Sequence, residues 1–338
     1  MKLIPELFTT NSFTLLTAPV AAGKTRQIIE FYKEEDFKII FVSPLRALAN
    51  EIFEKLNSEH KRIYLLGGKT SNQECMVDFL QAKKAFLVAT MELLNEEFLE
   101  AVATQKDKVL FVLDEFHLVY MWGQSFRLVL HDRFLGILET NASVLGLTAT
   151  MSEETMNLLV NDLSYHSDLW FHLDFGNQKL FRPPQKIHTF SSLEKAFFSR
   201  TFWRELKKKP VGLVYLVFCS YRGEVDELAQ RAKRLGFSSI GCVGGEVEKF
   251  LHELEQKQNK VDIIFSTTSL SHGVNLPEIS KVFISYEVGN YDFWLQMVGR
   301  GGRQGADYEV YTFDKYHFNQ REFIKNKFLD YWHDWTGI

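Results

Sequence analysis

The sequence predicts an α/β protein with two tandem units, each a mainly parallel sheet flanked by helices. The chain has 338 residues, beyond the roughly 250–300 at which a single core stops growing. Short apolar runs alternate with helical patterns in both halves, which is typical of βαβ repeats. The segment 176–184 combines Gly, Asn and a Pro-Pro pair and interrupts helices and ladders. We therefore expect units over residues 1–177 and 178–338.

Five apolar runs in the first half are predicted strands. They cover residues 13–17, 38–42, 85–89, 109–113 and 143–147. Helical patterns follow the first two runs, over about residues 24–33 and from Pro44 to Leu56. Because these strands are apolar throughout, we expect a parallel sheet that helices cover on both faces.

The second half repeats the plan with a different sequence. Predicted strands cover residues 213–218, 261–265 and 281–285, and an amphipathic helix covers 224–235. The Lys run at 207–209 is interpreted as a solvated helix end. From Asp307 onward the chain is rich in aromatic residues, which predicts a last strand and a helix packed on this unit. A base-stacking platform is the alternative for this tail.

Composition excludes several classes of protein. Apolar residues make up 46% and charged residues 24%, which rules out wholesale disorder. The apolar runs are far shorter than the about 20 residues that cross a membrane, and the first residues lack the core of a secretory signal. The three cysteines, Cys75, Cys219 and Cys242, are widely spaced and predict neither a disulfide framework nor a zinc site. We expect a cytoplasmic protein without a membrane partner.

The net charge of −4 argues against a protein that coats nucleic acid by bulk charge. The average hides an asymmetry. The first 175 residues hold 24 acidic and 16 basic side chains, and the remainder hold 19 and 23. A polyanion would therefore need a local site, which we expect to involve the second half.

A phosphate-binding loop is predicted directly after the first strand. Small residues let backbone N–H groups face a phosphate, and the helix that follows adds its positive end. A lysine and a threonine at the helix start then reach the β- and γ-phosphates and Mg²⁺. The alternative is an ordinary strand–helix turn. The candidate ATP-binding residues here are Ala18, Ala21, Ala22, Gly23, Lys24 and Thr25.

Two carboxylates end the strand at 109–113. Asp114 and Glu115 would lie at the carboxyl edge of the sheet, where α/β folds bind ligands. Asp114 is suited to hold Mg²⁺, and Glu115 to orient and deprotonate an attacking water. Solvated acids at a strand end are the alternative.

These residues resemble motifs of a superfamily 2 helicase of the DExH type, with 114–117 as its Asp-Glu-Phe-His box. The resemblance implies two RecA-like domains that hydrolyse ATP with Mg²⁺ in the cleft between them. It implies movement on, or remodelling of, single-stranded or short duplex DNA or RNA. Segments 43–49, 67–68, 89–92, 217–220 and 267–277 fall in the family's motif order. The nucleic-acid contacts implied are Pro44, Arg46, Gly68, Thr90, Ser220 and Thr267.

The remaining motifs assign coupling and catalytic residues by the same resemblance. Thr148 and Thr150 belong to motif III and, with His117, would couple ATP state to domain contact; a satisfied core histidine is the alternative for His117. In motif V, Gly273 and Asn275 would contact ATP. In motif VI, Arg300 and Arg303 would be the arginine fingers and Gln296 would help close the cleft. Guanidinium stays charged and binds two oxygens at once. The alternative interpretation of motif VI is a flexible basic loop.

The motif style is nearest to the Ski-type and related DNA-unwinding branch, from which the sequence departs. Only about 35 residues follow Arg303, and only 19 positions separate Pro277 from Gln296, too few for that branch's accessory domains and strand-separating hairpin. No glutamine that could read adenine occurs in the first 12 residues.

The main hypothesis is an ATP-dependent helicase or translocase. One alternative is a helicase-like ATPase subunit of a larger defence, repair or RNA-processing complex, whose protein partners supply the missing functions. Another is an ATP-gated nucleic-acid clamp without useful turnover.

Overall fold

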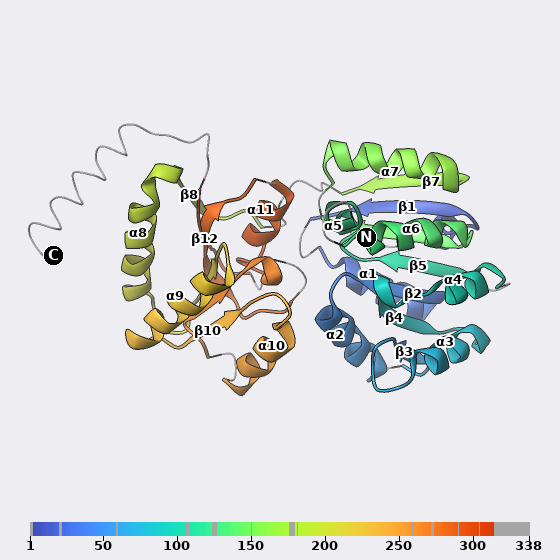
Figure 1. Ribbon diagram of the computed structural model, residues 1–338, viewed down its shortest axis with the longest axis horizontal. Helices are drawn as coiled ribbons and strands as arrows, with labels where there is room; N and C mark the ends of the chain where they lie inside the picture. Colours follow the sequence, from blue (N-terminus) through green and yellow to red (C-terminus); the bar gives the residue numbers. More distant parts are fainter. Residues whose placement is uncertain are drawn as a thin grey trace, which may run out of the picture. The chain divides into compact units, whose positions relative to one another are not determined.

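The computed structural model divides the chain into two compact units, Met1–Phe181 and Arg182–Ile338 (Figure 1). The predicted boundary lies a few residues earlier, between 177 and 178. The structure describes residues 3–19, 22–58, 60–105, 108–123, 127–149, 151–175, 180, 182–257, 260–271, 274–289, 291–303 and 305–313.

The first unit is a seven-stranded sheet in the order β3-β4-β2-β5-β6-β1-β7. All of its strand pairs are parallel, as the continuous apolar runs predicted. The carboxyl ends of the strands therefore meet at one edge. The strands are β1 (Ser12–Thr17), β2 (Lys38–Ser43), β3 (Ile63–Leu65), β4 (Phe86–Thr90), β5 (Val109–Leu113), β6 (Ser143–Thr148) and β7 (Leu169–Asp174).

Helices cover both faces of this sheet and form two apolar cores (Figure 1). One face packs against α1 (Lys24–Glu34) and α2 (Arg46–Asn57). The other packs against α3 (Asn72–Gln81), α4 (Glu96–Ala103), α5 (His117–Gly123), α6 (Val129–Glu139) and α7 (Glu153–His166). Short 3₁₀ turns lie at η1 (Pro5–Leu7) and η2 (Met91–Leu93).

Side-chain caps define the starts of three of these helices. Ser71, Asn95 and Ser152 accept a hydrogen bond from the backbone N–H three residues later, at the starts of α3, α4 and α7. Such a cap stabilises a helix by about 1 kcal/mol.

The second unit is a six-stranded sheet in the order β10-β11-β9-β12-β13-β8. Its strand pairs are again parallel, so it also has one carboxyl edge. The strands are β8 (Lys186–Phe190), β9 (Val214–Phe218), β10 (Ser239–Cys242), β11 (Ile263–Ser266), β12 (Ile279–Glu287) and β13 (Glu309–Phe313). The helices are α8 (Lys195–Lys207), α9 (Arg222–Arg234), α10 (Val247–Gln256) and α11 (Tyr291–Val298), with 3₁₀ turns η3 (Ser192–Glu194) and η4 (Thr268–Leu270).

Most predicted elements are present, with differences that have physical causes. Four strands were not predicted, β3, β7, β8 and β10, and all four lie at the edges of their sheets, where shorter or partly exposed strands carry a weaker apolar signal. The interpretation of 207–209 as solvated is wrong for Lys209. Its side chain is 3% exposed and its Nζ lies 2.8 Å from Asp262 Oδ1. The predicted last strand is β13, and the tail beyond residue 313 lies outside the described residues.

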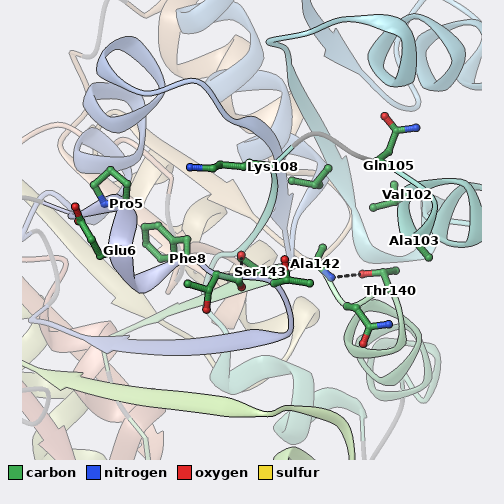
Figure 2. Close-up of a pocket in the computed structure, with 14 residues that line it drawn as sticks. Pro5, Glu6, Phe8, Val102, Ala103, Gln105, Lys108, Thr140, Ala142 and Ser143 are labelled. Carbon is green, nitrogen blue, oxygen red and sulfur yellow. Dashed lines mark hydrogen bonds between the residues drawn. The ribbon is translucent and has the colours of Figure 1, made fainter.

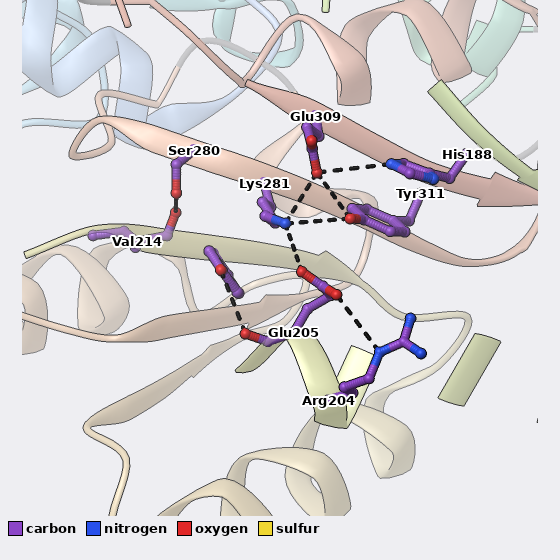
Figure 3. Close-up of polar contacts among 9 residues, drawn as sticks. His188, Arg204, Glu205, Val214, Ser280, Lys281, Glu309 and Tyr311 are labelled. Atoms are coloured by element: carbon purple, nitrogen blue, oxygen red, sulfur yellow. Dashed lines mark hydrogen bonds and ion pairs between the residues drawn. The ribbon is translucent and has the colours of Figure 1, made fainter. Parts of the chain in front are cut away.

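A partly buried polar cluster joins three elements of the second unit (Figure 3). Lys281 Nζ on β12 donates to Glu205 Oε2 on α8 at 2.7 Å, lies 3.0 Å from Glu309 Oε2 on β13, and donates to the Tyr311 hydroxyl at 3.2 Å. The Tyr311 hydroxyl donates to Glu309 Oε2 at 2.8 Å. Burial alone would raise the pKa of Glu309, but the hydrogen bonds from Lys281 and Tyr311 outweigh it and hold that pKa below its usual value.

We expect Glu309→Gln to lower the free energy of unfolding by about 1–2 kcal/mol at pH 7, because it removes one charge from this cluster. A depressed carboxyl pKa stabilises the fold above the unfolded pKa of about 4.3. The difference from wild type should therefore shrink as the pH falls below about 4. Urea unfolding at several pH values measures it. Glu253→Gln, which loses only a surface pair with Lys257, is the control, and an equal loss there would contradict the prediction.

No helix in the described part of the chain is long and apolar enough to cross a membrane. The three cysteines are buried and unpaired.

Candidate functional site

The predicted phosphate loop joins β1 to α1. Gly23 is the N-cap of α1 and has φ +81°, a left-handed conformation that favours glycine. A Cβ there would meet no atom within 4 Å, so the backbone conformation and not space requires glycine. Ala18 is buried, Ala22 and Thr25 are partly buried, and Ala21 lies outside the described residues.

The side chain of Lys24 turns back over this loop. Its Nζ donates to the carbonyl oxygens of Ala18 at 3.0 Å and Pro19 at 3.3 Å. The Lys24 ammonium therefore lies at the position where a phosphate entering the predicted loop would contact it.

The two predicted carboxylates follow β5 at the same edge of the sheet. The Asp114 N–H donates to Val42 O at 2.9 Å, and the Phe116 N–H donates to Leu147 O at 2.8 Å. Between them Glu115 has φ +47°, a strained conformation for a non-glycine residue. The neighbouring strands thus hold the carboxylate pair in a position that the isolated chain would disfavour.

The electrostatics of this pair fit a cation. Burial and the neighbouring Glu115 together raise the pKa of Asp114 to about 7, against the opposing effect of Lys24. Two carboxylates beside one ammonium leave excess negative charge. Carboxylate and hydroxyl oxygens are the donors that Mg²⁺ prefers, which is the chemistry predicted for Asp114 and Thr25.

His117 and Thr148 connect the carboxylate pair to the next strand. His117 Nδ1 lies 2.9 Å from the Thr148 hydroxyl, and both residues are buried. Burial lowers the pKa of His117 to about 4, so the ring is neutral at pH 7. This geometry brings together two of the three predicted coupling residues, and the third, Thr150, lies outside the described residues.

The predicted nucleic-acid contacts of the first unit lie at the ends of three adjacent strands. Pro44 follows β2, Gly68 follows β3, and Thr90 ends β4. Arg46 begins α2 and donates from Nη2 to Gly67 O at 2.6 Å. The structure therefore brings these residues to one end of the edge that also carries the phosphate loop.

Arg127 was missed by the sequence analysis. It donates to Pro44 O at 3.1 Å, pairs with Glu92 after β4, and lies over the Trp122 ring at 5.1 Å. It thus bridges two of the predicted contact segments. A single arginine 83 positions from Pro44 gives no spacing signal, so only the fold reveals it.

In the second unit, Ser220 follows β9 and Thr267 follows the adjacent β11. The Ser220 N–H donates to Glu224 Oε2 at 2.8 Å. The Thr267 and Ser269 hydroxyls lie 3.2 Å apart. Ser220 is exposed and Thr267 partly exposed, so both remain accessible to a ligand.

Motifs V and VI are tied together by the buried Arg300. Its side chain is 1% exposed and donates from Nη1 to Val274 O at 2.7 Å. Gln296 on α11 is also buried, whereas Arg303 is partly exposed and donates from Nε to Gly299 O at 3.2 Å. Asn275 is exposed, and Gly273 lies outside the described residues.

The glycines of motif VI have a packing role. A Cβ at Gly301 would lie 2.1 Å from the Tyr308 ring, so this ring requires glycine there. The Tyr308 hydroxyl in turn donates to Arg182 O at 3.0 Å, which fixes the start of the unit.

A pocket of about 480 Å³ lies at the opposite, amino-terminal edge of the first sheet (Figure 2). Glu6, Phe8, Lys108 and Ser143 are among its lining residues. The Ser143 hydroxyl donates to Thr9 O at 2.7 Å. No predicted site residue lines this pocket, so it is separate from the candidate site.

The chain is similar to known helicases in both of its units. The DEAD/DEAH box helicase family matches residues 1–158, and the helicase conserved C-terminal domain matches residues 199–305. The chain is 28% identical over 280 residues to the probable ATP-dependent DNA helicase RecS of Bacillus subtilis, covering 80% of this chain and 54% of that protein. It is 24% identical over 306 residues to the RecQ-like DNA helicase BLM of Xenopus laevis, covering 82% and 21%. The chain thus spans about half or less of the length of these two relatives.

A third relative and two solved structures match at lower identity. A probable ATP-dependent RNA helicase of Methanocaldococcus jannaschii is 21% identical over 341 residues, covering 98% of this chain and 88% of that protein. The S. cerevisiae Dbp5 structure with RNA and ADP BeF3 gives a TM-score of 0.64 at 15% identity, covering 95% and 83%. The structure of Mss116p with single-stranded RNA and AMP-PNP gives a TM-score of 0.67 at 17% identity, covering 92% of this chain and 67% of that chain. The fold is that of two RecA-like domains. RecQ-like and DEAD-box relatives do not support the Ski-type branch.

Proposed function

We propose that this chain is an ATP-dependent nucleic-acid helicase or translocase. The proposal proceeds from the N- and C-terminal domains of a superfamily 2 helicase core, which the chain carries. ATP binds between the two RecA-like domains, residues 1–177 and 178–338, and its hydrolysis drives movement on single-stranded or short duplex nucleic acid.

One observation carries the proposal. In the first unit, β6 lies between β1 and β5, so the phosphate loop, motif III and the carboxylate pair meet at one sheet edge. The contact between His117 and Thr148, at 2.9 Å, joins the second and third of these. This arrangement supports phosphoryl transfer from ATP to water. It also supports a connection between the carboxylate pair and motif III through the contact between His117 and Thr148.

The side chains of the first unit have separate roles in this proposal. Lys24 binds the β- and γ-phosphates, and the loop from Ala18 to Thr25 donates backbone N–H groups to them. Thr25 and Asp114 would hold Mg²⁺, which when bound neutralises charge on the phosphates. Glu115 orients water and accepts its proton.

The second unit supplies Arg300, Arg303 and Gln296, with Asn275 from motif V. Arg303 is partly exposed and Arg300 is held by Val274. We propose that closure presents both guanidinium groups to the γ-phosphate, where charge develops during hydrolysis.

Nucleic acid is proposed to bind through its phosphate–sugar backbone at the carboxyl edges of both sheets. Pro44, Arg46, Gly68 and Thr90 serve the first unit, and Ser220 and Thr267 the second. Contacts of this kind predict weak sequence preference and strong salt dependence. The relatives include named DNA and RNA helicases, so both nucleic acids are proposed substrates.

An ATPase assay with matched single-stranded DNA, single-stranded RNA and duplexes, over a salt series, tests the function. We expect stimulation by at least one single strand that fades as salt rises. Equal turnover with and without every nucleic acid would overturn the proposal.

We expect Thr148→Val to uncouple nucleic-acid binding from hydrolysis, because valine keeps the shape but removes the hydroxyl that His117 contacts. Stimulation by single strands should fall about tenfold or more while ATP binding is retained. The free energy of unfolding should fall by about 1–3 kcal/mol, since the buried hydrogen bond between the imidazole and this hydroxyl is lost.

Ser143→Ala at the opposite end of β6 is the matched control. It removes the buried hydrogen bond to Thr9 O and should lower stability without changing stimulation. Loss of stimulation in both variants would show a general effect of stability and contradict the coupling role.

A further inference from the structure

Tyr221 is an exposed aromatic side chain whose position the proposed function does not explain. Three tyrosines in the described part of the chain are strongly exposed: Tyr165 at 78%, Tyr221 at 63% and Tyr291 at 56%. The Tyr291 ring stacks on Trp294, with centroids 5.6 Å apart and planes at 21°. Tyr165 lies on α7 of the first unit. Among the described residues, Tyr221 makes no contact with another ring.

The helix that Tyr221 begins would be more stable with another residue there. Tyr221 is the N-cap of α9, with extended backbone (φ −150°, ψ 165°) and no side-chain cap hydrogen bond. Ser, Thr, Asp and Asn cap this position, and their loss costs about 1 kcal/mol. Neither capping nor burial therefore accounts for a tyrosine here.

The ring is nevertheless held in place. A Cβ at Gly223 would lie 3.4 Å and 3.5 Å from the Cε2 and Cδ2 atoms of Tyr221, so one ring edge lies beside this glycine. Glu224 fixes the loop, because its Oε2 accepts from the Ser220 N–H and its Oε1 accepts from the Ser285 hydroxyl on β12, both at 2.8 Å. A fixed loop lowers the entropy cost when a ligand stacks on an aromatic ring that the loop carries.

The surroundings of the ring match single-stranded nucleic acid. Tyr221 follows Ser220, a proposed backbone contact, and precedes Arg222, whose side chain is 62% exposed and donates to Gly244 O after β10. Nη1 of Arg222 also lies 3.7 Å from Glu246 Oε1, so this guanidinium is ion-paired, and the exposed ring of Tyr221 next to Ser220 offers the surface on which a base can stack.

We propose that Tyr221 is a base-stacking site for single-stranded DNA or RNA, beyond the backbone contacts of the proposed function on which it rests. Stacking on one aromatic ring is tolerant of sequence because every base has a π face. Tyr221 would therefore make binding depend on the presence of a base and not on its identity.

The test measures fluorescence anisotropy of labelled oligothymidylate and of an abasic strand of the same length, with oligouridylate in parallel. We expect Tyr221→Ala to bind the base-bearing strands at least about fivefold more weakly than wild type, the lower limit for loss of one stacked base. It should bind the abasic strand equally well. Tyr221→Phe keeps the ring and should match wild type, and Tyr165→Ala is the control for loss of an exposed tyrosine.

The possible outcomes distinguish failure of the stacking role from failure of the proposed helicase function. If Tyr221→Ala binds every strand as wild type does, or loses equally on base-bearing and abasic strands, stacking is wrong while the helicase proposal stands. If wild type binds no strand and its ATPase is not stimulated, the proposed function fails, and the stacking role with it.

Discussion

Lys24→Ala should abolish ATP hydrolysis. Lys24 is the only lysine of the loop from Ala18 to Thr25, and its Nζ already lies over that loop, 3.0 Å from Ala18 O. Alanine leaves the phosphates without this cation as charge develops on them. Loss of one such electrostatic contact costs about 100- to 1000-fold in turnover. Steady-state ATPase assays with saturating single strand measure the effect.

Arg26→Ala is the matched control, because it removes a cation from the same helix. Arg26 pairs with Glu30 at 2.9 Å on the surface of α1, and loss of such a pair costs at most about 1 kcal/mol of stability. Its ATPase should equal wild type. Retention of more than about a tenth of wild-type turnover by Lys24→Ala would contradict the phosphate-binding role.

Glu115→Gln should separate ATP binding from ATP hydrolysis. Glutamine keeps the size of the side chain but cannot accept the proton of an attacking water. We expect turnover to fall at least about 100-fold while a fluorescent ATP analogue binds with nearly unchanged affinity. Nucleic acid should bind more tightly in the presence of ATP, because the closed state persists.

Glu97→Gln, an exposed position in the first turn of α4, provides the control for loss of a carboxylate in the same unit. It should leave both binding and turnover unchanged. Equal loss of ATP binding and hydrolysis in Glu115→Gln would show that Glu115 shapes the site and does not activate water.

Predictions of strands and helices from adjacent residues were the most successful. The loop before α1 could be predicted because a buried strand, small residues and Gly23-Lys24 are contiguous, and contiguous residues set local backbone geometry. The same holds for Asp114 and Glu115 after β5. Predictions failed where burial depends on distant partners. A run of three lysines predicts that Lys209 is solvated, yet its side chain is 3% exposed and pairs with Asp262 on a distant segment.

The sequence by itself determined two parallel α/β units, a glycine-containing loop between a strand and a helix, and a carboxylate pair at a strand end, since apolar periodicity and local spacing encode these features. Only the tertiary structure decided that β6 lies between β1 and β5, which brings Thr148 to His117. It also revealed the bridge from Arg127 to Pro44 and the open ring of Tyr221. The physical reason is that strand order, burial and exposure arise from contacts between residues far apart in the chain, for which no spacing rule exists.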